Sequence, residues 1–119
     1  MTSAQYSVAR SYAGEWMGAA EVRRYSLRRG IPTDLPRTKT AVYITELADR
    51  RVAYVGQTRQ GTATRLAQHA RRWDRASRWS YVWVVPILNS VPDNQLHKIE
   101  GRIGQLLKPT DSIRLPRPY

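Results

Sequence analysis

The chain has 119 residues, which is enough for one compact domain. Lys and Arg number 20 against 9 Asp and Glu, so the net charge is +11. Such an excess favours a polyanionic partner, because cationic side chains that contact phosphates release counterions. The alternative is a basic surface that only keeps the protein soluble.

Several protein classes are excluded by what the sequence lacks. Cysteine is absent, which excludes disulfides and Cys-based zinc sites. No apolar run approaches the roughly 20 residues of a spanning helix, and the first ten residues lack the apolar segment of a signal peptide. We therefore expect a cytoplasmic protein that has no membrane partner.

The first 38 residues are predicted to form a basic helical arm. Apolar and small residues recur at helical spacing over residues 14–29, and Gly30 is a plausible cap. Two prolines in residues 31–36 then mark a connector. Arginines gather near the end of this segment, and we expect three of them to contact nucleic acid: Arg23, Arg24 and Arg28.

Residues 39–119 are predicted to form an α/β domain with a β-β-α-β-α order. The sheet is expected to have three mostly antiparallel strands flanked by helices, with β-branched and aromatic runs at 41–45, 52–56 and 81–85. A polar stretch at 46–51 suits a hairpin turn. Helices are expected at 62–73 and between a cap at Ser90 and Pro109. The tail, residues 110–119, is expected to be an extended strap or a loosely ordered end.

Each of the first two predicted strands carries a tyrosine that is a candidate functional residue. Tyr43 and Tyr54 lie on paired strands of the expected hairpin, where cross-strand or diagonal contact is possible. Taken alone, the pair is better explained as part of the core. Gly56, at the end of the second strand, either opens a turn or lets a ligand approach the backbone.

The two predicted helices of this domain each carry polar candidates. An apolar face is expected on the first helix from residues at helical spacing: Ala63, Leu66, Ala70 and Trp73. Arg65, His69 and Arg72 share the opposite face. This places the histidine on a solvated basic stripe or on a phosphate-binding one. Glu100 lies at the edge of an apolar face, where a cation would relieve the cost of burying its charge. Two glycines one turn apart predict close packing of that side of the helix: Gly101 and Gly104.

The order of these features resembles the GIY-YIG nuclease superfamily. The matching features are Ala-Val-Tyr-Ile at 41–44, Tyr-Val-Gly-Gln-Thr at 54–58, Arg65 followed by His69, and Glu100 in a helix. They span about residues 40–109. Ala41 replaces the glycine of the first motif. The family asparagine after the glutamate helix is missing, and Asp111 or Ser112 can stand in for it.

The resemblance implies a metal-dependent endonuclease that hydrolyses phosphodiester bonds, with double-stranded DNA as the expected substrate. It implies Mg²⁺ or Mn²⁺ on Glu100, and a homodimer on the substrate if both strands are cut together. The implied catalytic residues are Tyr43, Tyr54, Arg65, His69 and Glu100. Further nucleic-acid contacts are expected from Gly56, Gln57, Thr58, Arg59 and Arg72.

Three other functions are compatible with the sequence. The first is a nucleic-acid-binding module without catalysis. The second is a toxin or effector nuclease that acts on DNA or RNA with the same chemistry. The third is a structural protein bound to ribosomal RNA, which would leave Glu100 without a metal.

Overall fold

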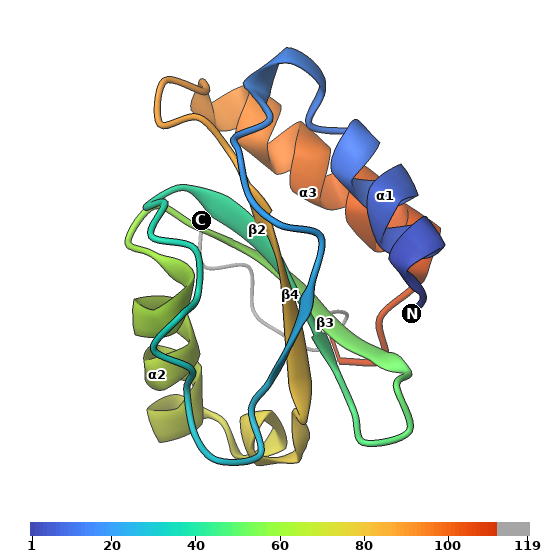
Figure 1. Cartoon of the computed structure of the whole chain (residues 1–119), viewed down its shortest axis with the longest axis vertical. Coiled ribbons are helices and arrows are strands. Elements are labelled where there is room, and N and C mark those ends of the chain that lie inside the picture. The colour runs from blue at the N-terminus through green and yellow to red at the C-terminus, as the bar shows by residue number, and fades with distance from the viewer. Residues whose placement is uncertain (112–119) are drawn as a thin grey trace.

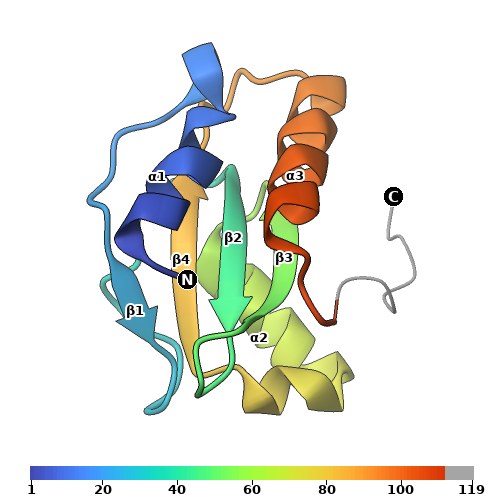
Figure 2. The same ribbon diagram turned by 90° about the vertical axis from the view of Figure 1, so that its right-hand side faces the viewer.

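A four-stranded antiparallel sheet forms the middle layer of the protein and has helices on both faces (Figures 1 and 2). The computed structural model describes residues 1–111. The strand order is β1-β4-β2-β3. The strands are β1 (Arg24–Ser26), β2 (Ala41–Glu46), β3 (Val52–Thr58) and β4 (Tyr81–Pro86). The helices are α1 (Ser3–Ser11), α2 (Thr62–Arg72) and α3 (Asp93–Leu107), with short 3-10 turns η1 (Gly14–Trp16) and η2 (Asp74–Arg78).

The protein is therefore of the α/β class, and the predicted β-β-α-β-α order is present as β2, β3, α2, β4 and α3. The expected hairpin joins β2 and β3. Its turn is closed by a hydrogen bond from the Leu47 amide to the Arg51 carbonyl, and Arg50 takes the left-handed conformation at φ 69°. The Asp49 carboxylate accepts from the Arg51 amide, as turn carboxylates commonly do.

The sheet separates two cores, because alternate side chains of a strand point to opposite faces. Val42 and Ile44 of β2 pack with α1 and α3, whereas Ala41 and Tyr43 pack on the side of α2. Figure 2 shows α1 and α3 side by side on one face of the sheet. All six residues of β2 are buried, as a strand covered on both faces requires.

A buried carboxylate ties the start of the chain to the sheet. Glu46 is fully buried, and its Oε2 accepts from the Met1 ammonium group at 2.7 Å. Its Oε1 accepts from Trp83 Nε1 at 2.9 Å. Both oxygens of the Glu46 carboxylate are therefore hydrogen-bonded, as a buried ion needs to be.

In the described part of the chain, none of the helices has the length and apolar content needed to cross a membrane.

The helix expected over residues 14–29 is wrong, and so is the three-stranded sheet. Gly14 has a positive φ of 54°, only a 3-10 turn follows it, and Arg24–Ser26 forms the fourth strand beside β4. Gly30 consequently caps no helix. Backbone pairing with a neighbouring strand has overridden a weak helical periodicity. The helix of this segment lies earlier, at Ser3–Ser11, where Thr2 and Gln5 form a capping box.

Other expectations for the C-terminal part are also corrected. The residue that precedes α3 is Pro92 and not Ser90, and no side chain caps the helix. A Cβ atom added at Gly101 or Gly104 would meet nothing within 4 Å, so the close packing expected there is wrong. The backbone amides of Thr110 and Asp111 bond to carbonyls of β3. The rest of the predicted tail, residues 112–119, lies outside the described residues.

Candidate functional site

The two tyrosines meet because the register of the hairpin places a glycine opposite one of them. Tyr43 pairs with Gly56, and the Tyr43 and Tyr54 ring centroids lie 6.0 Å apart. A Cβ atom at Gly56 would come within 2.5 Å of Tyr43 Oη and 2.6 Å of Tyr54 Cε2. The diagonal contact expected from the sequence is thus present, and Gly56 provides the room for it.

His69 is buried against these tyrosines. The Tyr43 hydroxyl and His69 Nε2 share a hydrogen bond of 2.8 Å, and the Tyr54 ring lies edge-on to the imidazole at 5.2 Å. Trp73 and Trp79 complete an aromatic cluster round the imidazole. The solvated basic stripe expected on α2 is therefore wrong for His69, which is only 7% exposed.

The rotation of α2 explains this difference. Its buried residues are Thr62, Leu66 and His69, while Ala63 and Ala70 of the expected apolar face are exposed. Alanine has little apolar surface to bury, whereas an imidazole packed on aromatic rings removes much more surface from water.

Burial sets the protonation of the Tyr43–His69 pair. Desolvation raises the pKa of Tyr43 well above its ordinary value, Tyr54 and Glu100 add to the rise, and Arg65 opposes it. Desolvation lowers the pKa of His69 to about 4, and the nearby charge of Arg65 acts in the same direction. Both groups are therefore neutral at pH 7, and the direction of their hydrogen bond depends on the tautomer of His69.

A surface hollow of about 270 Å³ lies between β3, α2 and α3, and we call it the Glu100 hollow. It contains six of the candidates from the sequence: Tyr54, Gln57, Thr58, Arg59, Arg65 and Glu100. It also contains Gln60 and Gln68, which sequence reasoning missed. The position of Gln68 three residues after Arg65, on the same helix face, is the signal that could have found it.

Hydrogen bonds order the polar side chains of the Glu100 hollow. Arg65 Nη1 donates to Gln68 Oε1 at 3.0 Å, and Gln68 Nε2 donates to Gln60 Oε1 at 2.9 Å. On the other side, Arg59 Nη2 donates to the Asp93 carboxylate at 2.7 Å and to the Val91 carbonyl. Arg65 is thus held by a neutral amide, and its charge is not neutralised by a carboxylate among the described residues.

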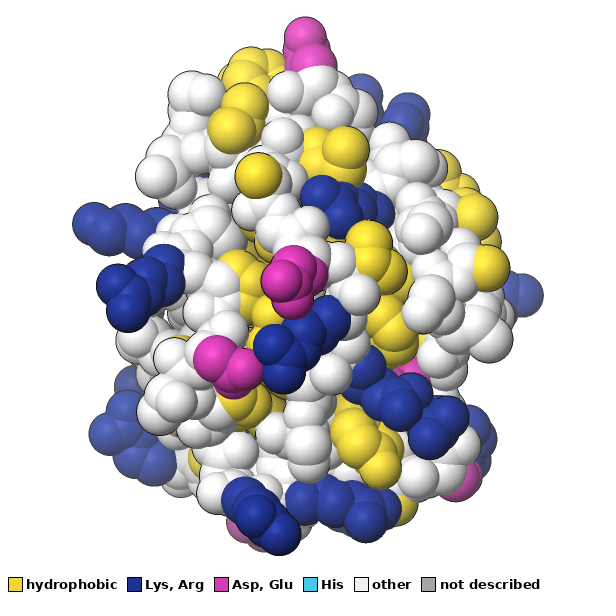
Figure 3. All heavy atoms as spheres, in the orientation of Figure 1, with side chains coloured by type: hydrophobic (Ala, Val, Ile, Leu, Met, Phe, Trp, Pro, Cys, Tyr) yellow, Lys and Arg dark blue, Asp and Glu magenta, His cyan; other side chains and the backbone are white. Residues whose placement is uncertain are grey.

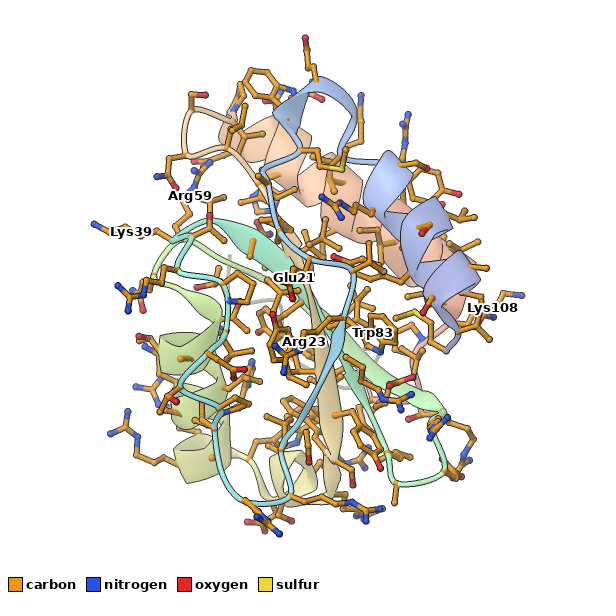
Figure 4. The ribbon with its side chains drawn as sticks, viewed as in Figure 1. Glu21, Arg23, Lys39, Arg59, Trp83 and Lys108 are labelled. Carbon is orange, nitrogen blue, oxygen red and sulfur yellow. The ribbon has the colours of Figure 1, made fainter. Side chains whose placement is uncertain are left out.

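The remaining candidates lie elsewhere. Tyr43 and His69 are behind the wall of the hollow, and Arg72 is exposed on α2 without lining it. Three arginines belong to the β1 region, where Arg23 pairs with Asp34 at 3.2 Å and two others lie over the Tyr81 ring: Arg24 and Arg28. Figure 4 shows Arg23 well apart from Arg59. Basic side chains are spread widely over the face in Figure 3.

Asp111, a candidate for the missing asparagine, lies beside the aromatic cluster. Trp79 Nε1 donates to its Oδ2 at 3.3 Å, and Arg75 Nη1 lies 3.4 Å from its Oδ1. Trp79 in turn stacks on Tyr54, with centroids 5.3 Å apart. Asp111 therefore supports Tyr54 through Trp79 and does not line the Glu100 hollow. Ser112, the other candidate, lies outside the described residues.

The donor set of the Glu100 hollow fits a hard divalent cation. Within residues 1–111, groups of three or more His, Asp or Glu that could hold a metal ion are not found. Mg²⁺ commonly uses one or two carboxylates and several waters, so such a group is not a requirement. Glu100 supplies a carboxylate, whereas the Oε1 atoms of Gln60 and Gln68 already accept hydrogen bonds, so water molecules would complete the coordination of the ion.

Comparison of the chain with protein-family models, with curated proteins and with solved structures finds no match. The family resemblance stated above therefore stays a prediction. The same holds for the catalytic roles that it implies, and their support comes from the geometry of this chain alone.

Two glycines offer a matched test of the tyrosine contact. Gly56→Ala should lower the free energy of unfolding by about 1–3 kcal/mol, because the new methyl group overpacks the Tyr43 ring. Gly101→Ala should raise it by up to about 1 kcal/mol, because nothing obstructs the methyl group and alanine favours a helix. Urea unfolding of both variants measures this, and equal effects would contradict the crowding at Gly56.

Acid should destabilise the protein through His69. With a folded-state pKa of about 4 against an ordinary 6.5, the unfolded chain takes up the proton first as the pH falls. The stability from neutral His69 is complete above pH 6.5 and is lost between pH 6.5 and 4, by at most about 3 kcal/mol. The free energy of unfolding, measured at a series of pH values in this range, should fall with decreasing pH less steeply in His69→Gln than in the unchanged protein. An NMR titration midpoint of His69 near 6.5 would refute the burial effect.

Proposed function

We propose that this protein is a metal-dependent endonuclease of the GIY-YIG type that cuts DNA. The observation that carries the proposal is the convergence of Arg65 and Glu100, from two different helices, on one hollow beside Tyr54. A cation and a carboxylate at the same open site are what phosphodiester hydrolysis needs, one to bind the phosphate and the other to bind a metal ion.

Each side chain of the hollow has a distinct proposed task. Arg65 binds a non-bridging phosphate oxygen and opposes the charge that grows in the transition state. Glu100 holds Mg²⁺ or Mn²⁺, which when bound neutralises the phosphate and assists the leaving oxygen. Tyr54 orients the phosphate or the attacking water from the wall of the hollow. Gln60 and Gln68 keep the Arg65 guanidinium pointed into the site.

Tyr43 and His69 have a proposed role in proton transfer. If the Tyr43 hydroxyl accepts a proton from the attacking water, it must release its own proton. Nε2 of His69, 2.8 Å from the hydroxyl, is the proposed acceptor of that proton. The low pKa of His69 keeps its ring neutral, so one ring nitrogen carries no proton, but it also makes the ring a weak base. Arg65 favours the ionised form of Tyr43, whereas burial opposes it. The pair would therefore act only when a bound metal ion adds positive charge near Tyr43 to that of Arg65, because the phosphate itself brings negative charge.

The charge of the chain supports a nucleic-acid substrate. The net charge of +11 favours the binding of a polyanion. Gln57, Thr58 and Arg59 line the site, with the buried Gly56 next to them in β3. The β1 arginines and Arg72 supply proposed contacts farther away. The proposed active site occurs once among residues 1–111, so a double-strand break requires a homodimer on the substrate or two successive nicks. A digest of plasmid, single-stranded DNA and RNA with and without Mg²⁺ tests the activity and the substrate together.

Glu100→Gln should abolish cleavage almost completely while the fold and the binding of DNA persist. The amide keeps the shape of the side chain but holds a divalent cation poorly, so the phosphate is no longer neutralised. Glu21→Gln, which removes the same charge at an exposed position, is the control. A Glu100→Gln protein that nicks plasmid at close to the original rate would overturn the metal site.

Arg65→Ala should cost far more cleavage rate than Arg71→Ala. Arg65 lines the Glu100 hollow, whereas Arg71 is exposed on α2 and does not. A loss of roughly 2–4 kcal/mol in transition-state stabilisation is expected for one preorganised donor. Single-turnover cleavage rates of the two variants measure the difference. Similar losses would point to a diffuse basic surface, as in a binding module without a catalytic centre.

A further inference from the structure

A second hollow lies on the other side of α3. It has a volume of about 190 Å³ and lies between η1 with its flanking residues and α3. We call it the Trp16 hollow. Its side chains include two aromatic rings, two cations, one carboxylate and one amide: Tyr12, Trp16, Lys98, Arg102, Glu15 and Gln95.

The chemistry of these side chains suits a nucleotide. Tyr12 and Trp16 are half-buried because they pack partly against the core, and the exposed part of each side chain lines the hollow, where a base can pack on it. Lys98 and Arg102 are exposed, and among the described residues neither forms an ion pair. They are therefore available to a phosphate. Glu15 and Gln95 can hydrogen-bond to the edge of a base, where exocyclic amines donate to a carboxylate.

The geometry of α3 relates the two hollows. Lys98 and Arg102 are each two residues from Glu100, which is a rotation of about 200° round an α-helix. They consequently project from the side of α3 opposite to Glu100. The helix with its side chains is about 10 Å thick. A strand that leaves the Glu100 hollow can therefore reach the Trp16 hollow by crossing one helix.

We propose that the Trp16 hollow binds an unpaired nucleotide of the nucleic-acid strand that occupies the Glu100 hollow. A base in a duplex is stacked on both sides and cannot also stack on a protein ring, so the site selects substrates with a single-stranded segment. The preferred substrate is then a flap, fork or branch and not a blunt duplex. This inference rests on the proposed function only in placing nucleic acid at Glu100.

The test compares a short duplex that carries an unpaired tail with the same duplex without it. Binding is measured by fluorescence anisotropy in EDTA, so the outcome does not depend on cleavage. The double variant Lys98→Gln/Arg102→Gln should lose about ten-fold or more of its affinity for the tailed duplex, and clearly less for the blunt one. The charge-matched control is Arg71→Gln/Arg78→Gln, which alters exposed residues on the α2 side of the sheet. Equal losses in the two double variants, or no preference for the tail, would overturn the proposal.

A cross-link locates the tail directly. A tail that contains 5-bromouracil should couple on irradiation to residues 11–23, the tryptic peptide that contains Tyr12 and Trp16. Coupling to residues 52–59, which contain Tyr54, would place the tail in the Glu100 hollow and refute the assignment. Displacement of the tail by an equal concentration of a nucleoside monophosphate would reassign the Trp16 hollow to a free nucleotide. The Glu100→Gln result is independent of all these outcomes, so failure of the nuclease proposal is recognised separately.

Discussion

The absence of a side chain at Gly56 is the constraint on which the site depends. Tyr43 is opposite this glycine in the β2–β3 ladder, and its ring occupies the space that a Cβ atom would fill. Because the ring lies there, its hydroxyl reaches His69 and its neighbour is Tyr54. The β2–β3 hairpin and α2 are consequently joined by one polar contact inside an aromatic cluster. The wall of the Glu100 hollow is built on that cluster.

The aromatic cluster also explains the electrostatics of the site. Tyr54, Trp73 and Trp79 exclude water from the His69 imidazole, which keeps it neutral. The same burial keeps Tyr43 protonated. Arg65 lies between this apolar interior and the open hollow, so its charge acts on both. A buried neutral pair therefore lies directly behind the surface that we propose to bind a polyanion.

Helix α3 has a comparable double role. Its buried residues Leu96, Ile99 and Ile103 hold it on the sheet and against α1. The two sides that remain face different hollows, with Glu100 in one and Lys98 with Arg102 in the other. The second hollow exists only because α1 and η1 pack beside α3. The first residues of the chain, which the sequence suggested as a separate arm, thus contribute a wall next to the proposed catalytic helix.

The sequence by itself determined the elements from β2 to α3, because their signals are local: β-branched runs, a polar turn and apolar residues at helical spacing. It also indicated that Tyr43 and Tyr54 can meet across the hairpin, either directly or diagonally, and the register selected the diagonal contact. Only the tertiary structure decided the rest. Residues 24–26 became a strand because β4 offered a free edge, and His69 was buried because Tyr43 and Tyr54 of the hairpin pack against it. The convergence of Arg65 and Glu100 depends on how two helices rotate on opposite faces of a sheet, and no local pattern encodes that rotation.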